Sequence, residues 1–368
     1  MIRILHVVSV MDVGGMESFI MNMYRRMDRT AIQFDFLVHH KRRGAFEDEI
    51  ERLGGRVYHL SLMDDFNLPK YLRQLKRLFD DHPEYRVVHG HLGSTAFFYL
   101  GEAARHGLPG RILHSHIADY DRTLKGNIKR WLFRLAPKYA NVYLACSDKA
   151  GKYLFRKTAF EFIPNGIDTE MFRFKASVRN DIRRACCIED NAYVLGLVGR
   201  FHNQKNHVYL LEFFSRIKAK VSNAKLLLVG NGELMNMIQR KTEQMGIADS
   251  VIFAGLQMNA ADWYQAMDVF VMPSLFEGLP LSGVEAQCAG LPCFFSDQIT
   301  REVAVSDRAV FLPIGSENID RWANALIDAA SHIENRCDAL PERALQFDIG
   351  SVADAMARRY QQLWKENA

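Results

Sequence analysis

The chain has 368 residues, of which 48% are hydrophobic. A single compact core of usual size does not hold so many apolar residues, so we predict two domains. A secretory signal consists of basic residues, then an apolar run, then small residues, whereas the opening residues of this chain carry Arg3, Asp12 and Glu17. No apolar run is long enough for a membrane span. We therefore expect a cytoplasmic protein. Its six cysteines lack metal-ligand spacing and disulfide-scaffold density, so we expect reduced thiols.

Charge is distributed unevenly along the chain. Residues 1–168 hold 26 Lys and Arg against 19 Asp and Glu, a formal charge of +7, whereas residues 169–368 hold 21 against 24, a formal charge of −3. The basic half predicts an anionic ligand or surface nearby. Nucleic acid is not expected, because basic and aromatic residues are not interleaved in any recognisable motif.

Strands and helices alternate through the first half. An apolar run at 2–8 leads into Gly14-Gly15 and then into a helical stretch at 17–26. Further strands are predicted at 34–38, 57–60, 87–89, 112–114 and 142–145, with helices at 44–53, 70–80 and 94–106. This alternation is typical of a parallel sheet with helices on both faces.

A turn cluster, IPNGID at 163–168, divides the chain. We place an N-terminal domain at 1–168, a second domain at 169–348 and a final helical segment at 349–368. The second domain shows the same alternation, with strands at 194–198, 226–229, 251–254, 269–272 and 293–295, and helices at 206–220, 233–245, 260–267, 281–289 and 317–331. The last helix, 350–366, has one apolar face that must pack on something: Val352, Met356, Tyr360 and Leu363.

The most informative segment is FEGLPLSGVEAQCAGLP at 276–292. Glu277 lies in a loop, and Glu285 lies about one turn inside a helix that begins near Leu281. The unpaired N–H groups of a helix start attract phosphate, and a carboxylate one turn further accepts hydrogen bonds from two ribose hydroxyls. The spacing predicts a nucleotide diphosphate site; the alternative is that Glu285 faces solvent and that Gly278 and Gly290 are turn and cap glycines.

Two cations follow the strand at 194–198. Gly199-Arg200 comes directly after it, and Lys205 precedes the next helix. Together they suit a departing diphosphate, whose charge they neutralise without a metal. Taken singly, each is equally consistent with ordinary surface charge.

These motifs occur in the order found in one family. Gly14-Gly15, IPNGID, VGRFHNQKN at 198–206, GNGE at 230–233 and FEGLPLSGVEAQCAG together resemble retaining glycosyltransferases of family four, and they span nearly the whole chain. The segment LHVVSVMDVGGMESFIMNMYR, followed by QFDFLVH, resembles the branch associated with bacterial exopolysaccharide and capsule assembly.

The resemblance implies the GT-B architecture, an α/β fold with two Rossmann-like, doubly wound parallel-sheet domains facing each other across a cleft. The N-terminal domain would bind the acceptor, the C-terminal domain the sugar nucleotide, and the last helix would cross back onto the first domain. Arg200 and Lys205 would contact the donor diphosphate, Glu285 the ribose and Glu277 the transferred sugar. The other donor-binding positions that the resemblance implies are Gly14, Gly15, Gly199, Gly278, Leu279, Pro280 and Leu281.

His116 matches a histidine that contacts the donor sugar in family members. His114 and His116, like His89 and His91, form a His-x-His pair that would also suit a metal. Neither pair comes with carboxylates or thiolates at ligand spacing, so we expect no metal and no cofactor. A buried, hydrogen-bonded histidine is the alternative for His116 and the favoured interpretation of the other three.

A basic, amphipathic segment at 124–140 carries apolar residues on one helical face. Such a helix either lies on an anionic membrane, bringing the site to a lipid-linked acceptor at the inner face of the cytoplasmic membrane, or packs as a core helix with a solvated basic face. Phe133 lies off the apolar face and favours contact with something external.

Retaining hydrolases use a paired nucleophile and acid, which the sequence does not clearly provide. We therefore predict a metal-independent, retaining hexosyltransferase that works by same-face displacement, with a nucleotide diphosphate sugar, expected to be UDP-linked, as donor. The expected acceptor is a growing lipid-linked glycan in exopolysaccharide, capsule or other cell-surface polysaccharide synthesis. The alternatives are a non-catalytic sugar-nucleotide-binding assembly subunit, an inverting transferase and a sugar-nucleotide epimerase; the complete set of Arg200, Lys205, Glu277 and Glu285 argues against them.

Overall fold

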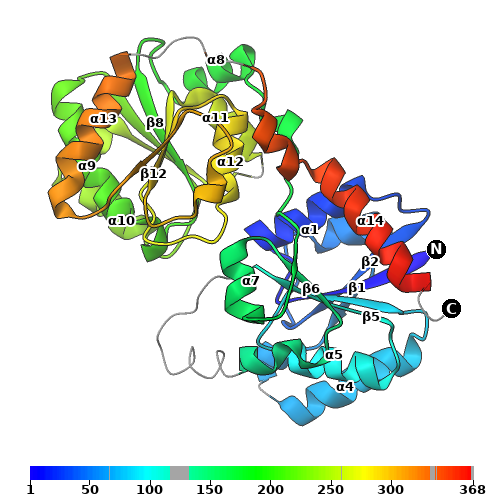
Figure 1. The fold of residues 1–368 in the computed structure, drawn as a ribbon. Helices are drawn as coiled ribbons and strands as arrows, with labels where there is room; N and C mark the ends of the chain where they lie inside the picture. The colour runs from blue at the N-terminus through cyan, green and yellow to red at the C-terminus, as the bar shows by residue number, and fades with distance from the viewer. Residues whose placement is uncertain (66, 117–131, 258, 332–335, 337, 366–368) are drawn as a thin grey trace. The chain divides into compact units, whose positions relative to one another are not determined.

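The computed structural model describes residues 1–365 except 66, 117–131, 258, 332–335 and 337. The chain divides into two compact units, one made of Met1–Ile167 with Phe347–Ala368 and one made of Asp168–Gln346 (Figure 1). Each unit is built on a parallel sheet, which confirms the predicted pair of doubly wound α/β domains.

The first unit contains a seven-stranded sheet in the order β3-β2-β1-β4-β5-β6-β7, with every neighbouring pair parallel. Its strands are β1 Ile2–Val8, β2 Ile32–Val38, β3 Val57–His59, β4 Val87–Gly90, β5 Gly110–Ser115, β6 Val142–Ala145 and β7 Glu161–Phe162. Its helices are α1 Gly15–Arg26, α2 Glu47–Arg52, α3 Leu62–Asp65, α4 Leu68–Asp81, α5 Ala96–Arg105, α7 Asp148–Phe155 and α14 Ile349–Lys365.

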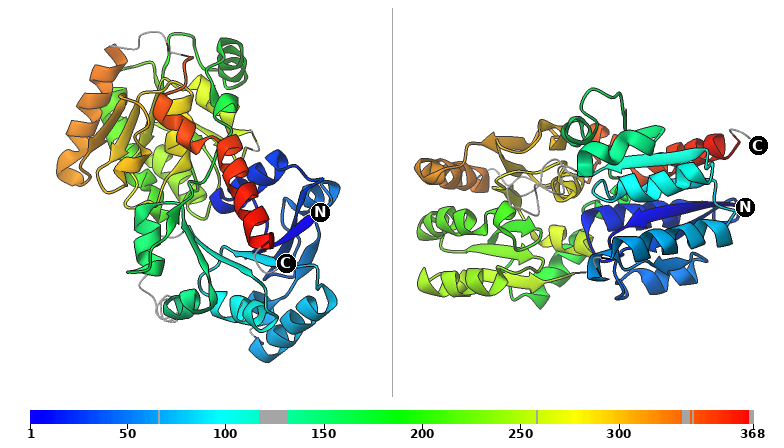
Figure 2. Two further views of the ribbon diagram at one scale, coloured as in Figure 1. Left: turned by 45° about the vertical axis from the view of Figure 1, so that its right-hand side comes forward. Right: turned by 90° about the horizontal axis from the view of Figure 1, so that it is seen from below.

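Helices cover both faces of this sheet. α1 and α14 share a core with one face, and α4, α5 and α7 share a core with the other (Figures 1 and 2). The apolar face predicted for the last helix is buried, and full burial of each such side chain contributes about 1.5–3 kcal/mol. The last helix of the chain therefore completes the core of the first unit.

The second unit contains a six-stranded parallel sheet in the order β10-β9-β8-β11-β12-β13. Its strands are β8 Tyr193–Val198, β9 Ala224–Val229, β10 Val251–Gly255, β11 Val269–Met272, β12 Cys293–Ser296 and β13 Ala309–Leu312. Its helices are α8 Ala176–Ala185, α9 His207–Lys220, α10 Met235–Gln244, α11 Ala260–Ala266, α12 Leu281–Cys288 and α13 Ile319–Ser331. α9, α10 and α13 pack on one face, where Trp322 stacks on Phe213 (Figure 1).

The sheet order of the second unit reverses between β8 and β11, because the chain builds outward from β8 in one direction and then returns to build from β11 in the other. In doubly wound sheets ligands bind beyond the carboxyl ends of the strands at this point of reversal. The loops that follow β8 and β11 are therefore the positions where the fold places a ligand.

The predicted strands and helices of the described segments are present, and five further strands and α-helices were missed, one of them the four-residue helix α3. β7 and β13 are short edge strands with exposed residues, so their burial pattern is weak. α8 is rich in arginine and buries only Arg183, which leaves little apolar periodicity to detect. α7 contains Gly151 but starts at a good cap, because the Ser147 side chain accepts a hydrogen bond from the Ala150 N–H.

Residues 124–131 of the predicted basic helix lie outside the described residues. The rest of that segment forms a helical turn at 132–135 followed by a 3-10 helix, Ala136–Tyr139. The expectation that Phe133 contacts something external is wrong. Its side chain is 6% exposed and packs against Gly93 and the Tyr153 ring in the core of the first unit.

Within the described part of the chain, every helix is too short or too polar to cross a membrane.

Candidate functional site

The loops that follow β8 and β11 are joined by hydrogen bonds. The Leu275 N–H donates to the Gln204 carbonyl at 2.8 Å, and the Gln204 side-chain amide donates to the Phe276 carbonyl at 2.9 Å. Asn206, whose left-handed backbone ends the first loop, donates from its side chain to the Pro273 carbonyl. The two predicted motifs at 198–206 and 276–290 therefore form one structure at the point where the strand order reverses.

Lys205 and Glu277 form an ion pair at the centre of this structure. Lys205 Nζ lies 2.8 Å from Glu277 Oε1, and the Gln204 amide donates to Glu277 Oε2 at 2.9 Å. The Lys205 and Glu277 side chains are only 15% and 9% exposed, so water screens the pair weakly. The Lys205 stem lies against Gly199, where a Cβ atom would come within 3.0 Å of Lys205 Cε. Gly199 thus leaves space for the lysine.

Glu285 projects from α12, whose N-terminal residue is Leu281. Its Oε2 accepts a hydrogen bond of 2.6 Å from the hydroxyl of Tyr264, a fully buried residue of α11. Burial raises the pKa of Glu285, while the Tyr264 hydrogen bond and the positive charge of Lys205 oppose the rise. Lys205 therefore acts electrostatically on both predicted carboxylates.

The loop from Gly278 to Pro280 leads into α12. Leu279 is buried, and Pro280 occupies the N-cap position in extended conformation. Pro280 provides no side-chain cap, and the Gly283 N–H donates to the Pro280 carbonyl at 3.0 Å, so the N–H groups of Leu281 and Ser282 are the candidates for binding an anion.

Arg200 does not join this cluster. Its side chain is 72% exposed, and Nη2 lies 3.2 Å from Oε2 of Glu233, the acidic residue of the GNGE motif. The loop that carries Arg200 is nevertheless held against the GNGE loop, because the Phe201 N–H donates to the Asn231 carbonyl at 3.0 Å. Gly230 is required at this approach, since a Cβ atom there would lie 2.1 Å from the Gly199 carbonyl oxygen.

Two positions of α12 are structural. Gly283 packs against Val303 and Phe295, where a Cβ atom would lie within 3.0 Å of both side chains. The buried Gln287 side chain donates to the carbonyls of Gly283 and Val303 and accepts from the backbone N–H groups of Val305 and Ser306. Gln287 thus anchors the helix that carries Glu285.

In the first unit, Gly14 and Gly15 begin α1. Gly14 is the N-cap, and Glu17 at the third helical position folds back over it, with Oε2 2.5 Å from where a Gly14 Cβ atom would lie. Burial raises the pKa of Glu17 to about 7. A Cβ atom at Gly15 would meet no described atom within 4 Å, so the backbone at this position is open to a ligand.

His116 follows β5 in the first unit, and both of its ring nitrogens are engaged there. Nε2 lies 2.9 Å from His91 Nδ1, and Nδ1 lies 3.0 Å from the Asn165 side-chain oxygen. The structure therefore does not present a free His116 nitrogen to a sugar. It also brings the two predicted His-x-His pairs together, which the sequence did not reveal, and adds His6 of β1.

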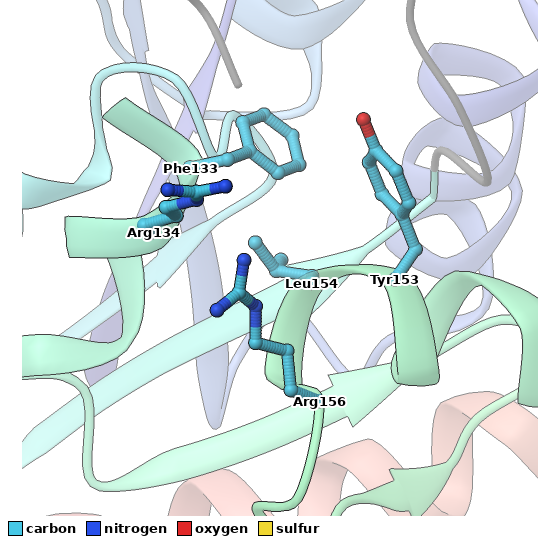
Figure 3. Close-up of a pocket in the computed structure, with 5 residues that line it drawn as sticks. All are labelled: Phe133, Arg134, Tyr153, Leu154 and Arg156. Atoms are coloured by element: carbon cyan, nitrogen blue, oxygen red, sulfur yellow. The ribbon is translucent and has the colours of Figure 1, made fainter. Parts of the chain in front are cut away.

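A small hollow of about 80 Å³ lies on the first unit, lined by Phe133, Arg134, Tyr153, Leu154 and Arg156 (Figure 3). It is too small for a sugar nucleotide, because ligand pockets usually measure about 300–1,000 Å³. Figure 3 shows the guanidinium groups of Arg134 and Arg156 on one side and Tyr153 on the other. Two cations thus adjoin an apolar surface.

Comparison with known proteins identifies the family. A model described as Glycosyltransferase Family 4 matches residues 13–171, and one described as Glycosyl transferases group 1 matches residues 192–332. Putative glycosyltransferase EpsF of Bacillus subtilis is 34% identical over 337 residues, covering 89% of this chain and 88% of that protein. The chain is a family 4 glycosyltransferase.

Two further proteins are similar to this glycosyltransferase. UDP-Gal:alpha-D-GlcNAc-diphosphoundecaprenol alpha-1,3-galactosyltransferase of Escherichia coli is 27% identical, covering 89% of this chain and 87% of that enzyme. The crystal structure of Anabaena HepE with UDP-glucose superimposes with a TM-score of 0.82 at 15% identity, covering 98% of this chain and all of that chain. The fold of the glycosyltransferase is thus GT-B.

Proposed function

We propose that this glycosyltransferase moves a hexose from a UDP-sugar to a growing, lipid-linked glycan, with retention of anomeric configuration, in the synthesis of a cell-surface polysaccharide. The Escherichia coli relative supports the donor and acceptor classes, since that enzyme uses UDP-galactose and a diphosphoundecaprenol-linked sugar. The capsular polysaccharide biosynthesis glycosyltransferase CapH of Staphylococcus aureus, which is 23% identical, supports the type of product.

The contact between Lys205 and Glu277 carries the proposal. A cation that holds a diphosphate and a carboxylate that holds a sugar must lie side by side, because the bond that breaks joins those two parts of the donor. Lys205 Nζ and Glu277 Oε1 are 2.8 Å apart, and Glu277 lies in the loop that leads into α12, a helix whose N-cap residue provides no side-chain cap. Glu285, one turn into α12, is placed to accept hydrogen bonds from the ribose.

In this proposal the leaving diphosphate is stabilised by the chain itself. Lys205 turns from Glu277 toward the diphosphate, and Arg200 leaves Glu233 to join it, so charge on the leaving oxygen is neutralised without a divalent cation at that position. Glu277 then orients the transferred sugar. The departing diphosphate accepts the acceptor proton on the same face of the sugar, which gives retention.

The hollow on the first unit suits an anionic, amphipathic acceptor. Arg134 and Arg156 are exposed, and they adjoin the partly apolar lining formed by Phe133, Tyr153 and Leu154. A lipid-linked glycan offers phosphate for the two exposed guanidinium groups beside the hollow.

The test measures nucleotide release from UDP-, GDP- and ADP-sugars by the purified protein, with polyprenyl-diphosphate-linked glycans as acceptors and no added Mg²⁺ or Mn²⁺. We expect release from a UDP-sugar and a turnover lower by about 10²–10³-fold in Lys205→Ala, as for loss of one group that stabilises transition-state charge. Lys225→Ala, which removes a lysine that contacts the Asp249 carbonyl in the same unit, is the matched control.

Proton NMR of the product at its anomeric position reports retention or inversion. Unchanged turnover in Lys205→Ala, or an inverted product, would contradict the proposed mechanism. If no donor turns over while UDP raises the thermal stability of the protein, the chain is a sugar-nucleotide-binding subunit.

A further inference from the structure

Five histidines form one cluster inside the first unit, on the face of the sheet that α1 and α14 cover. They come from three adjacent strands and the residues directly after them: His6 of β1, His89 and His91 at the end of β4, and His114 and His116 at the end of β5. Their rings are in contact, with centroids 4.2 Å apart for His89 and His91 and 4.1 Å apart for His114 and His116.

Three of these histidines converge on one point. One ring nitrogen each of His91, His114 and His116 lies within 4.8 Å of the other two. His91 Nδ1 and His116 Nε2 are 2.9 Å apart. His114 is 1% exposed; among the described residues its Nε2 makes no hydrogen bond of normal geometry, although the Ile163 backbone lies near the ring. A buried nitrogen without a partner is costly unless something else occupies its lone pair.

Binding through His91 Nδ1, His114 Nε2 and His116 Nε2 would leave the other ring nitrogen of each histidine facing an acceptor. His116 Nδ1 lies 3.0 Å from the Asn165 oxygen, His91 Nε2 lies 3.0 Å from His6 Nδ1, and His114 Nδ1 lies 3.2 Å from His89 Nε2. Histidines that bind a metal through one nitrogen characteristically donate the other N–H to an acceptor, which fixes the ring orientation. The three rings are oriented in this way.

From this arrangement we propose that His91, His114 and His116 bind a transition-metal ion, with Zn²⁺ as the expected occupant. The three histidines belong to the first unit, whereas Lys205, Glu277 and Glu285 belong to the second. His116 is also the position that the family resemblance assigns to the donor sugar, and the proposed metal would occupy it in place of that contact. The sequence argument against a metal rested on the absence of carboxylates near each His-x-His pair, and the fold supplies the third ligand by pairing β4 with β5.

The contact between His91 and His116 must lengthen to admit the ion. Two nitrogens that share a tetrahedral Zn²⁺ at 2.0–2.1 Å are about 3.3 Å apart, so the contact between His91 and His116 opens by about 0.4 Å. The ion replaces the proton that joins these two nitrogens. Burial lowers the pKa of His91 and His114 well below the usual range and that of His116 to about 4, so the imidazoles are neutral, as metal ligands must be.

A second histidine triad, His6, His89 and His91, is less suited. His89 Nδ1 lies 2.6 Å from the Tyr360 hydroxyl, and its Nε2 contacts His114. A metal on His89 would therefore break an existing hydrogen bond. In the chosen triad only one shared proton is displaced. Three neutral imidazoles leave the fourth position to water, hydroxide or another anion.

The experiment uses full-length protein produced without a polyhistidine tag, freed of metal with a chelator and then equilibrated with Zn²⁺ or Co²⁺. Elemental analysis after removal of loosely bound ion is expected to give one Zn²⁺ per chain. Co²⁺ is expected to give the intense visible absorption of a tetrahedral complex. Zn²⁺ is expected to raise the thermal unfolding temperature, because it binds only the folded state.

His116→Gln and Asn165→Ala test the assignment by different routes. His116→Gln removes a ligand, and we expect at least about 100-fold weaker Zn²⁺ binding; Asn165→Ala removes only the partner of His116, with an expected 10–100-fold weakening. His39→Gln is the matched control, because His39 is fully buried in the same unit but pairs with Tyr71 outside the cluster.

Either of two results would overturn the proposal. One is wild-type protein that retains far less than one Zn²⁺ per chain after loading. The other is equal loss of Zn²⁺ in His39→Gln and His116→Gln, each shown to be folded by circular dichroism. Because metal content is read without any sugar donor, neither result bears on the transferase reaction.

Discussion

The Tyr264 hydroxyl donates a 2.6 Å hydrogen bond to Glu285 Oε2. Tyr264 is fully buried on α11, whereas Glu285 lies on α12 and is only partly buried, so the bond holds one carboxylate oxygen inside the protein and leaves Oε1 for a ligand. Tyr264 is thus a positioning residue for the carboxylate that we propose binds the ribose.

Replacing Tyr264 with Phe is expected to weaken UDP binding on the order of 10-fold, since the hydrogen bond to a charged group is lost.

The same substitution is expected to change the pH dependence of UDP binding. Burial raises the pKa of Glu285 and the Tyr264 bond opposes that rise, so the variant has a still higher pKa. Binding that needs the ionised carboxylate is present above this pKa and lost as pH falls through it. The loss should therefore occur at higher pH in the variant, as measured by calorimetric titration with UDP.

Tyr193→Phe is the control for this measurement. Tyr193 is buried in the same unit, and its hydroxyl donates to the Leu326 carbonyl rather than to a carboxylate. If Tyr264→Phe and Tyr193→Phe show the same pH profile for UDP binding as the wild type, Tyr264 has no role in positioning Glu285.

Glu277→Gln separates donor binding from sugar transfer. The substitution keeps the shape of the side chain but removes the charge that holds Lys205, so Lys205 is freed for the diphosphate. We expect UDP to bind equally well or more tightly. Turnover should nevertheless fall about 100-fold, because the transferred sugar is no longer oriented for reaction.

Isothermal titration with UDP and steady-state rates with the full donor measure these two effects separately. Glu302→Gln, which changes an exposed carboxylate of the same unit, should alter neither. A parallel loss of UDP affinity and turnover in Glu277→Gln would instead place Glu277 at the nucleotide.

Much of the fold was predictable because strands buried on both faces read as short apolar runs. β1 and β11 illustrate this, since almost every residue of each strand is buried. α14 was predictable for a different reason, because its buried residues recur at helical spacing on one face. β13 and α8 were missed because an edge strand and a polar helix carry little periodic burial. Phe133 was misjudged because helical spacing does not show that Gly93, distant in sequence, opens a space for its ring.

The candidate site was predictable as a set of positions and not as a set of contacts. The positions of Lys205, Glu277 and Glu285 after strands placed them at one sheet edge, but their pairing depends on strand order, which the sequence does not state. Tyr264 and the histidine cluster were missed for the same reason. Each depends on elements that are neighbours only after folding.

Gln287→Leu is predicted to destabilise the second unit. The amide side chain satisfies four backbone groups between α12 and residues 303–306, and leucine of similar size satisfies none. Each buried group left without a partner costs about 1–3 kcal/mol, so the free energy of unfolding should fall by about 3 kcal/mol or more. Chemical denaturation with and without UDP measures the change. Gln244→Leu, at an exposed position of α10, should be close to neutral, and equal effects of the two substitutions would contradict this role of Gln287.

Charge reversal at Arg134 and Arg156 tests the proposed acceptor surface. Both guanidinium groups are exposed beside the hollow, and each basic group near an anionic surface contributes about 1 kcal/mol, or roughly fivefold. We expect Arg134→Glu and Arg156→Glu to weaken binding to vesicles of anionic lipid and to raise the KM for a lipid-linked acceptor. UDP affinity should be unchanged, because neither arginine is among the expected donor-binding positions and Lys205, Glu277 and Glu285 belong to the second unit.

Lys149→Glu is the matched control, since Lys149 is exposed on α7 but does not line the hollow. Wild-type binding to anionic vesicles should also weaken as salt is raised, because exposed charges are screened beyond roughly 8–10 Å at physiological ionic strength. If all three reversals weaken vesicle binding equally, the basic surface acts as a whole and the hollow has no special part in it. If none does, the acceptor reaches the enzyme by a different surface.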